Sequence, residues 1–465
     1  MTSVFLTITV PVLGAFVLAA LPKRFKPGFA LAVLAATFLS ALSILPGALS
    51  GKASALSINF TSWFSFSLAS DGLAVFMACV SSFVALLICA YSLEYMSHYE
   101  DRGRFYFWTV LFVGSMMGLI FSANLMLMYC FWELTAVCSW RLIGFYRGEE
   151  HTKAADRAFL VTFFGASLLL AGIVLTYINY GTLEFSLLKG AALPNIAAFL
   201  LLGGIIAKSA QLPLQTWLPD AGVAPSPVTA LLHAAVLVKI GVYAFARIFS
   251  STFIASPLFL NSVIALSVIT ILIAAGSALV ENNIKRVLAY STISQLGYII
   301  LALAIGTKFA FLIALLYIFA HSLAKAGLFL CAGIIEHKTN TKDIDLLGGL
   351  MKSMPLTACA YLLCAFSIIG IAPLFGFWPK FLLILETLRE GHIAAGILAV
   401  IGALFTLFYL FRLFDKVFLG EEKIKVFEEK NSPMVYVVVT LGVLSLLCGI
   451  LIKPVSDILT RLVGC

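Results

Sequence analysis

The sequence predicts an all-α protein that crosses a membrane many times. Of the 465 residues, 62% are apolar and only 11% are charged, and the mean hydropathy is +1.07. A soluble core of that size would need a polar shell that so few charged residues cannot supply. Long apolar runs recur along the whole chain, and basic residues gather in alternate connecting segments. Lipid is therefore expected to surround most of the molecule.

Fourteen apolar runs are long enough to cross about 30 Å of hydrocarbon as helices. The first run, Met1 to Leu21, lacks a basic start and a small-residue cleavage site, so we expect a retained span rather than a signal peptide. The predicted spans are 3–21, 28–48, 72–93, 105–121, 123–143, 157–179, 194–218, 227–247, 256–279, 287–304, 309–334, 354–388, 393–411 and 433–452.

Loop charges predict the orientation of these spans. Eighteen Lys and Arg residues, Lys285 among them, lie in one set of alternate loops, and seven lie in the other set. Basic residues collect on the cytoplasmic side, so this count places both termini outside. The net charge of +8 follows from this topology and requires no nucleic-acid partner.

Two predicted spans are interrupted by proline. The first, 194–218, contains Pro213 and runs into Pro219, and the second, 354–388, contains Pro373 and Pro379. Proline removes a backbone donor and kinks a helix, so the freed carbonyls need partners inside the protein or from water. Broken helices of this kind indicate internal cavities.

The two broken helices predict an inverted repeat. Each is the fourth helix of a group of five, counted from the fourth and from the ninth span, and an odd number of helices turns the second group upside down. We therefore predict N-terminal helices in 1–103, one five-helix repeat in 104–249, a second in 250–415, and a C-terminal loop and helix in 416–465.

Four lysines lie inside predicted spans: Lys208, Lys239, Lys325 and Lys380. Each costs at least about 2.5–3.5 kcal/mol at a helix centre, and a cost of this size is expected where the groups function. Burial disfavours the ammonium form and a nearby carboxylate favours it, so a neighbour can switch the charge of a buried lysine. These lysines predict a path for protons or sodium ions across the membrane.

Three further titratable residues belong to this candidate path. Glu133 lies within the fifth span and is the natural partner of a buried lysine, while His233 and His321 can give and take protons near neutral pH. His321 and Lys325 are four residues apart and share a helix face. A lone buried histidine or glutamate is often structural, but a set distributed over several helices favours proton transfer. Asp71 and Asp220 are explained by helix capping and a loop position.

The sequence gives no sign of a redox or nucleotide site. The nine cysteines are scattered, with no CxxC pair and no metal-ligand spacing with histidines, and no glycine-rich phosphate-binding motif occurs. We expect no cofactor and no metal in this chain, and any redox chemistry to belong to partner subunits.

Five segments of the sequence carry a family resemblance. They are FWELTAVCSWRLIGFY (131–146), KSAQLPLQTWLPDAGVAPSPVTALLHAAVLVKIGVYAFAR (208–247), ENNIKRVLAYSTISQLGY (281–298), HSLAKAGLFLCAG (321–333) and APLFGFWPK (372–380). These segments resemble the antiporter-like subunits shared by respiratory complex I, energy-converting membrane-bound hydrogenases and multi-subunit cation/proton antiporters. The resemblance implies that Glu133, Lys208, Lys239 and Lys380 form a polar axis at the membrane midplane, with Lys325, His233 and His321 as intermediate sites.

The resemblance implies a proton-translocating subunit of a redox-driven complex, similar to NADH:quinone oxidoreductase or a hydrogenase, in the inner membrane of a prokaryote. Other membrane subunits and a redox module would be its partners. A subunit of a sodium (cation)/proton antiporter without redox partners is the alternative, and a redox enzyme with its own quinone or haem site fits the lysines least. The largest complex I members carry an aspartate in the sixth helix, where this chain has Thr162 to Ser167, and a long lateral helix, so the other branches or a shorter complex I member fit better.

Overall fold

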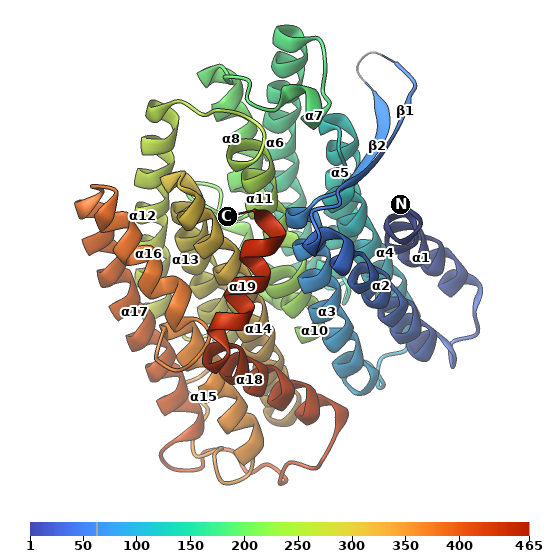
Figure 1. Cartoon of the computed structure of the whole chain (residues 1–465). Helices are drawn as coiled ribbons and strands as arrows, with labels where there is room; N and C mark the ends of the chain where they lie inside the picture. Colours follow the sequence, from blue (N-terminus) through green and yellow to red (C-terminus); the bar gives the residue numbers. More distant parts are fainter. Residues whose placement is uncertain (62–63, 465) are drawn as a thin grey trace.

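The computed structural model describes residues 1–61 and 64–464, and helices make up most of it (Figure 1). Within this part of the chain, eleven helices are long and apolar enough to cross a membrane. The predicted class, a mostly helical polytopic membrane protein, is confirmed. Figure 1 shows α1 (Thr2–Ala20) and α2 (Lys26–Leu49) at one side of the bundle, and α16 (Phe377–Arg389) and α17 (Ile393–Phe418) at the other.

Helices also follow the predicted order between these two sides. In the first half they are α3 (Gly72–Tyr95), α4 (Arg102–Phe121), α5 (Leu125–Ile143), α6 (Glu149–Tyr180), α7 (Phe185–Leu188), α8 (Asn195–Lys208), α9 (Trp217–Asp220), η1 (Ala221–Val223), α10 (Ser226–Ala230), η2 (Leu231–Ala235), α11 (Leu237–Phe245) and η3 (Ala246–Ser250). In the second half they are α12 (Pro257–Val280), α13 (Ile284–Ile305), α14 (Lys308–Thr339), α15 (Pro355–Ile369), α18 (Pro433–Ile450) and α19 (Ile452–Val463).

Short polar caps start several of the long helices. Asp71 accepts a hydrogen bond from the amide of Ala74 at the start of α3, as expected for a capping residue. Asn124, Asn283 and Thr307 cap α5, α13 and α14 in the same way. Because the connections before α5, α13 and α14 are only a few residues long, consecutive helices pack as antiparallel neighbours.

Every predicted span overlaps one helix or several consecutive short helices, but the count of fourteen crossings remains a prediction. The helices that open the two broken spans, α8 and α15, have 14 and 15 residues and are shorter than a full crossing. The helix α5 has 19 residues and carries Glu133 and Arg141, and it is also outside the eleven.

Both predicted breaks are present, and side chains satisfy the carbonyls that they free. At the first break, Trp217 donates through Nε1 to the carbonyl of Ala207 at 3.0 Å. At the second break, Lys380 donates to the carbonyl of Ile368 at 2.6 Å and to that of Ile369 at 3.1 Å. The expectation that these carbonyls are satisfied inside the protein is therefore met at both breaks.

Irregular turns also occur within the span at 226–250. Residues 231–235 form a π-helical turn, in which the amide of Val236 donates to the carbonyl of Leu231 at 2.9 Å. A second π-helical turn, η3, follows α11. Such turns are rare and concentrate at functional sites, and η2 contains His233.

Two elements were not expected from the sequence. An antiparallel hairpin of β1 (Ser54–Asn59) and β2 (Ser65–Ser70) projects at one end of the molecule (Figure 1). The final helix α19 packs against α3 and α14 with Leu459 and Leu462 buried. It approaches α3 so closely that a side chain at Gly72 would collide with the Leu462 carbonyl.

Candidate functional site

A row of buried lysines runs through the middle of the helix bundle. Lys208 ends α8, Lys239 lies in α11, Lys325 lies in α14 and Lys380 lies in the first turn of α16, and all four are buried. The elements that carry them touch in that order, since α11 packs against α8, η2 packs against both α11 and α14, and α14 packs against α16. The row therefore joins the two predicted repeats.

At the first end of the row, Lys208 lies beside α5. Its ammonium donates to the carbonyl of Trp132 at 3.2 Å and lies 5.3 Å from the centre of the Trp132 ring. Glu133, the next residue along α5, is close enough to act electrostatically on Lys208. Within the described chain the two make no ion pair, and Oε1 of Glu133 is buried without a hydrogen-bond partner.

The centre of the row joins Lys239 to His321. The Lys239 ammonium lies 2.5 Å from Nδ1 of His321, which connects α11 to α14. His233 stacks on Phe329 with ring centroids 4.3 Å apart. In the part of the chain that the structure describes, neither ring nitrogen of His233 has a partner, and Nε2 of His321 has none.

Neutral polar groups surround the last two lysines. Lys325 donates to the Ser291 hydroxyl at 2.6 Å and to the Leu288 carbonyl at 3.2 Å, and Ser291 lies 2.7 Å from the hydroxyl of Tyr409. Lys380, besides its two carbonyl acceptors, lies 5.1 Å from the ring centre of Tyr298. Both lysines therefore face α13.

The polar face of α13 was not recognised as part of the site in the sequence. Ser291, Gln295 and Tyr298 are spaced four and three residues apart, so they share one helix face. The amide oxygen of Gln295 accepts a hydrogen bond from Tyr317 at 2.6 Å. The segment 281–298 contains a pattern that could have indicated this face, because hydroxyl and amide side chains recur at helical spacing within an apolar span.

Lys285 was assigned to a cytoplasmic loop, and the structure corrects this. It is the second residue of α13, is 1% exposed, and pairs with Glu336 of α14 at 2.6 Å. The apolar run begins two residues later, so the sequence placed the lysine just outside the helix. Glu336 also contacts Lys342 at 3.2 Å and accepts a hydrogen bond from Ser226, which gives a partly buried charged cluster at this end of α14.

Two acidic groups at other positions have structural partners. Asp220 pairs with Arg157 at 2.6 Å and with Arg286 at 2.8 Å, so it links α6, α9 and α13. Glu386 is buried six residues after Lys380 and accepts a hydrogen bond from Thr307 at 2.7 Å. Glu386 had not been singled out from the sequence.

The fold and the buried lysine row define a class: polytopic helical membrane proteins in which two broken helices each present a charged side chain to the protein interior. Within that class, the family model described as NADH:quinone oxidoreductase/Mrp antiporter, TM, matches residues 122–406. The model for the N-terminus of chain 5 of NADH-ubiquinone oxidoreductase (complex I) matches residues 58–106. The chain belongs to the NADH:quinone oxidoreductase/Mrp antiporter family, as its motifs predicted.

Curated relatives come from both branches of this family. The chain is 38% identical over 402 residues to NADH-quinone oxidoreductase subunit L of Escherichia coli, an alignment that covers 84% of this chain and 65% of the relative. It is 34% identical over 478 residues to Na(+)/H(+) antiporter subunit A1 of Staphylococcus saprophyticus, covering 93% of this chain and 59% of the relative. The chain thus spans roughly 60% of the length of these two proteins.

Solved structures show the same fold over the whole chain. A chain of the Mrp complex from a Dietzia species superimposes with a TM-score of 0.92 at 23% identity, covering 100% of this chain and 97% of that one. A chain of the membrane-bound sulfane sulfur reductase, an archaeal respiratory membrane complex, gives a TM-score of 0.93 at 24% identity with the same coverage.

Proposed function

We propose that the chain is an antiporter-like subunit that moves protons across the membrane along its row of buried lysines. The observation that supports this most is a series of elements in contact, each of which carries a buried titratable side chain. The elements are α8, α11, η2, α14 and α16. Burying so many cationic groups in a membrane protein costs free energy, and such a cost is expected where the groups have a function.

In the proposed path, Glu133 holds the proton on Lys208 while the two charges face each other. When that interaction weakens, Lys208 releases its proton toward Lys239, and the short contact between Lys239 and His321 passes it to α14. Water held by the unpartnered nitrogens of His233 and His321 completes this step. Lys325 and then Lys380 receive the proton, and exit follows toward the outside.

We further propose that the chain works inside a multi-subunit complex of a prokaryotic inner membrane, with a redox module as the energy source. The relatives of this chain include a subunit of NADH-quinone oxidoreductase, and one of the similar folds belongs to a respiratory complex. The sequence carries no redox or nucleotide-binding motif, so we propose that partner subunits supply the driving energy.

A cation/proton antiporter without redox partners is the second candidate. The specific observation in its favour is the match to an Na(+)/H(+) antiporter subunit over 93% of this chain. A sodium site prefers several oxygen ligands, whereas the buried titratable groups here are mostly nitrogens. Protons are therefore the favoured ion under either candidate.

Substitution at the start of the row tests the proposed path. We expect Glu133→Ala and Lys208→Ala each to abolish proton movement into vesicles that contain the assembled complex, measured with a pH-sensitive dye, while the variant chains still insert. Lys52→Ala, an exposed loop lysine, is the matched control and should transport normally. Inserted Glu133 and Lys208 variants with undiminished proton movement would exclude this path.

Purification in mild detergent followed by mass spectrometry distinguishes the two candidates. Co-eluting iron–sulfur or nickel-bearing subunits would support the redox-driven complex. Small hydrophobic subunits alone, together with sodium-dependent transport, would support the antiporter.

A further inference from the structure

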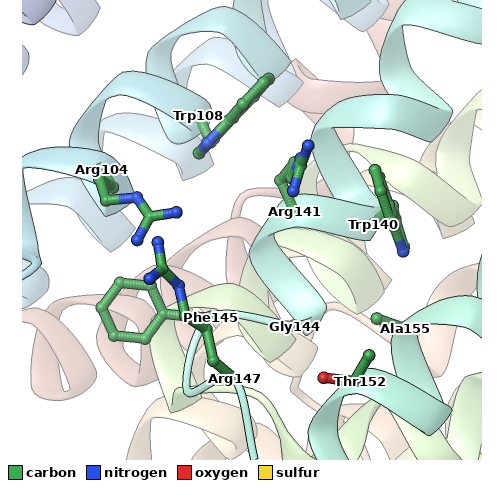
Figure 2. A pocket seen from close by; sticks show the side chains of 9 residues that line it. All are labelled: Arg104, Trp108, Trp140, Arg141, Gly144, Phe145, Arg147, Thr152 and Ala155. Carbon is green, nitrogen blue, oxygen red and sulfur yellow. The ribbon is translucent and has the colours of Figure 1, made fainter.

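A basic pocket lies between the ends of α4, α5 and α6, away from the lysine row. Its volume is about 250 Å³, and the loop charges assign this end of the molecule to the cytoplasmic side. Figure 2 shows three guanidinium groups around the opening, from Arg104 at the start of α4, Arg141 in the last turn of α5 and Arg147 in the following loop. Two tryptophans, Trp108 and Trp140, line the same opening.

Three arginines line one pocket although their like charges repel one another. In Figure 2 the side chains of Arg104 and Arg147 point toward each other. Arg147 takes a positive φ of 56°, a backbone conformation that is unusual for a residue with a side chain. An anion between these two guanidiniums would offset their repulsion and accept charge-assisted hydrogen bonds from them.

Nearby carboxylates neutralise only part of the charge of the pocket. Asp101 pairs only with Arg104, at 3.2 Å, and Asp156 accepts a hydrogen bond from Nε1 of Trp140 at 2.8 Å. Across the described residues, the guanidiniums of Arg141 and Arg147 take part in no ion pair and donate no hydrogen bond. Arg141 instead lies over the Trp140 ring, 4.3 Å from its centre, which holds it at the pocket.

An apolar surface continues from the pocket along α6. The Phe159 ring contacts Trp140 at 5.6 Å and Phe163 at 5.8 Å. Farther along, Leu160, Phe163 and Phe164 are 63%, 48% and 56% exposed. The site therefore combines a basic pocket, half-buried tryptophans at its rim and an exposed apolar strip beyond it. These features match a phospholipid, because its phosphate lies at the membrane interface and its acyl chains lie in the hydrocarbon.

We propose that this pocket binds the phosphate group of an anionic phospholipid. The three guanidiniums hold the phosphate oxygens through charge-assisted hydrogen bonds, and Trp108 and Trp140 flank the glycerol region. The acyl chains lie along Phe159, Phe163 and Phe164. Basic pockets between membrane helices on the cytoplasmic side are well suited to such headgroups.

The test titrates the purified, delipidated protein with three probes and follows binding by native mass spectrometry. The probes are dioleoylphosphatidylglycerol, dioleoylphosphatidylcholine and inorganic phosphate. We expect the anionic lipid to bind the wild-type protein at least about tenfold more tightly than the zwitterionic lipid, given the contribution of each basic side chain near a membrane. Inorganic phosphate should bind far more weakly than the anionic lipid.

Two variants and one control locate the binding. The double variant Arg141→Gln/Arg147→Gln should lose the preference for the anionic lipid, and the single variant Arg147→Gln, in an exposed loop, should weaken it without affecting folding. Arg24→Gln removes the same charge from an exposed loop elsewhere and should bind like the wild type.

Several results would overturn the proposal. An unchanged lipid preference in the double variant would show that this pocket is not the binding site. Equal binding of both lipids to the wild type would show that the site does not select by charge. Inorganic phosphate that binds as tightly as the lipid would make this a free-anion site. A second protein subunit that co-purifies with the wild type and is lost only from the double variant would make the pocket a protein interface instead.

Discussion

At the scale of single residues, the buried lysines are held mainly by neutral acceptors. Lys208, Lys325 and Lys380 each donate to a main-chain carbonyl, and in the described part of the chain none of them lies within 4.0 Å of a carboxylate. A carbonyl stabilises an ammonium less than a full negative charge does, so no fixed partner locks the proton in place. Under the proposed mechanism, a change in a neighbouring charge would then move the proton.

The contact between Lys239 and His321 gives a prediction about His321. The variant His321→Gln keeps a polar side chain of similar reach but cannot carry a proton. We expect it to reduce proton movement at least roughly tenfold, because a positioned acid–base group usually contributes more than that. The pH-sensitive dye assay measures this effect. His392→Gln, in the connection before α17, is the control, and equal loss in both variants would argue against a specific relay.

The sequence identified the charged members of the row but missed the neutral ones. Lysine and glutamate are rare inside apolar spans, so Lys239 and Glu133 were conspicuous by composition alone. Serine and tyrosine are common in membrane helices, so Ser291 and Tyr409 gave no such signal until their contacts with Lys325 and with each other were known. Lys285 was missed because a helix end cannot be located from hydropathy to within two residues.

At the scale of elements, the two broken helices were predicted from proline, and the structure shows how they are stabilised. The second break depends on a close approach, because the amide of Gly376 donates to the Ser367 hydroxyl at 3.1 Å. A Cβ added at Gly376 would lie 1.9 Å from the carbonyl oxygen of Ser367. Glycine is therefore required where α15 and α16 meet.

The substitution Gly376→Ala should force α15 and α16 apart. We expect a lower melting temperature in detergent, because overpacking against a backbone atom costs about 1–3 kcal/mol. Proton movement should also fall, because Lys380 would lose its carbonyl acceptors at the end of α15. The matched control is Gly276→Ala in α12, where a new methyl group meets no atom within 4 Å. A melting temperature for Gly376→Ala equal to that of the control would contradict this description of the break.

A second element-scale prediction concerns the ion pair that joins α3 to η3. Arg247 is buried and contacts Asp71 through both terminal nitrogens, one of them at 2.8 Å, and it also donates to Tyr243. Desolvation of the Asp71 carboxyl opposes its ionisation, but the Arg247 guanidinium outweighs this effect and holds the pKa of Asp71 below its ordinary value. The stabilisation by this pair is therefore complete at neutral pH and is lost as the pH falls below about 4.

The variant Asp71→Asn isolates that charge, because asparagine still caps α3. We expect a lower melting temperature at pH 7, since Arg247 is left buried without its partner. The difference in melting temperature between the variant and the wild type should become smaller on acidification, because the wild-type Asp71 carboxyl then also becomes neutral. Asp101→Asn, which removes one member of the exposed pair with Arg104, should have little effect at either pH.

At the scale of the whole molecule, the sequence predicted the order of helices better than the number of crossings. Apolar runs located every long helix, whereas the count of fourteen crossings stays a prediction, because eleven of the described helices are by themselves long and apolar enough to cross. The hairpin at 54–70 was missed because its strands have only six residues each. The helix α19 was missed because its polar and apolar residues alternate at helical spacing without forming an apolar run.

The most direct test of proton movement along the row is a transport measurement on Lys325→Met. Lys325 lies on α14, the helix that contacts elements of both predicted repeats, and methionine keeps its length without its charge. Methionine removes the desolvation cost of the buried ammonium, so the variant should insert and melt near the wild-type temperature. We predict that its vesicles nevertheless show no proton movement. A stable Lys325→Met chain that moves protons at the wild-type rate would contradict the account.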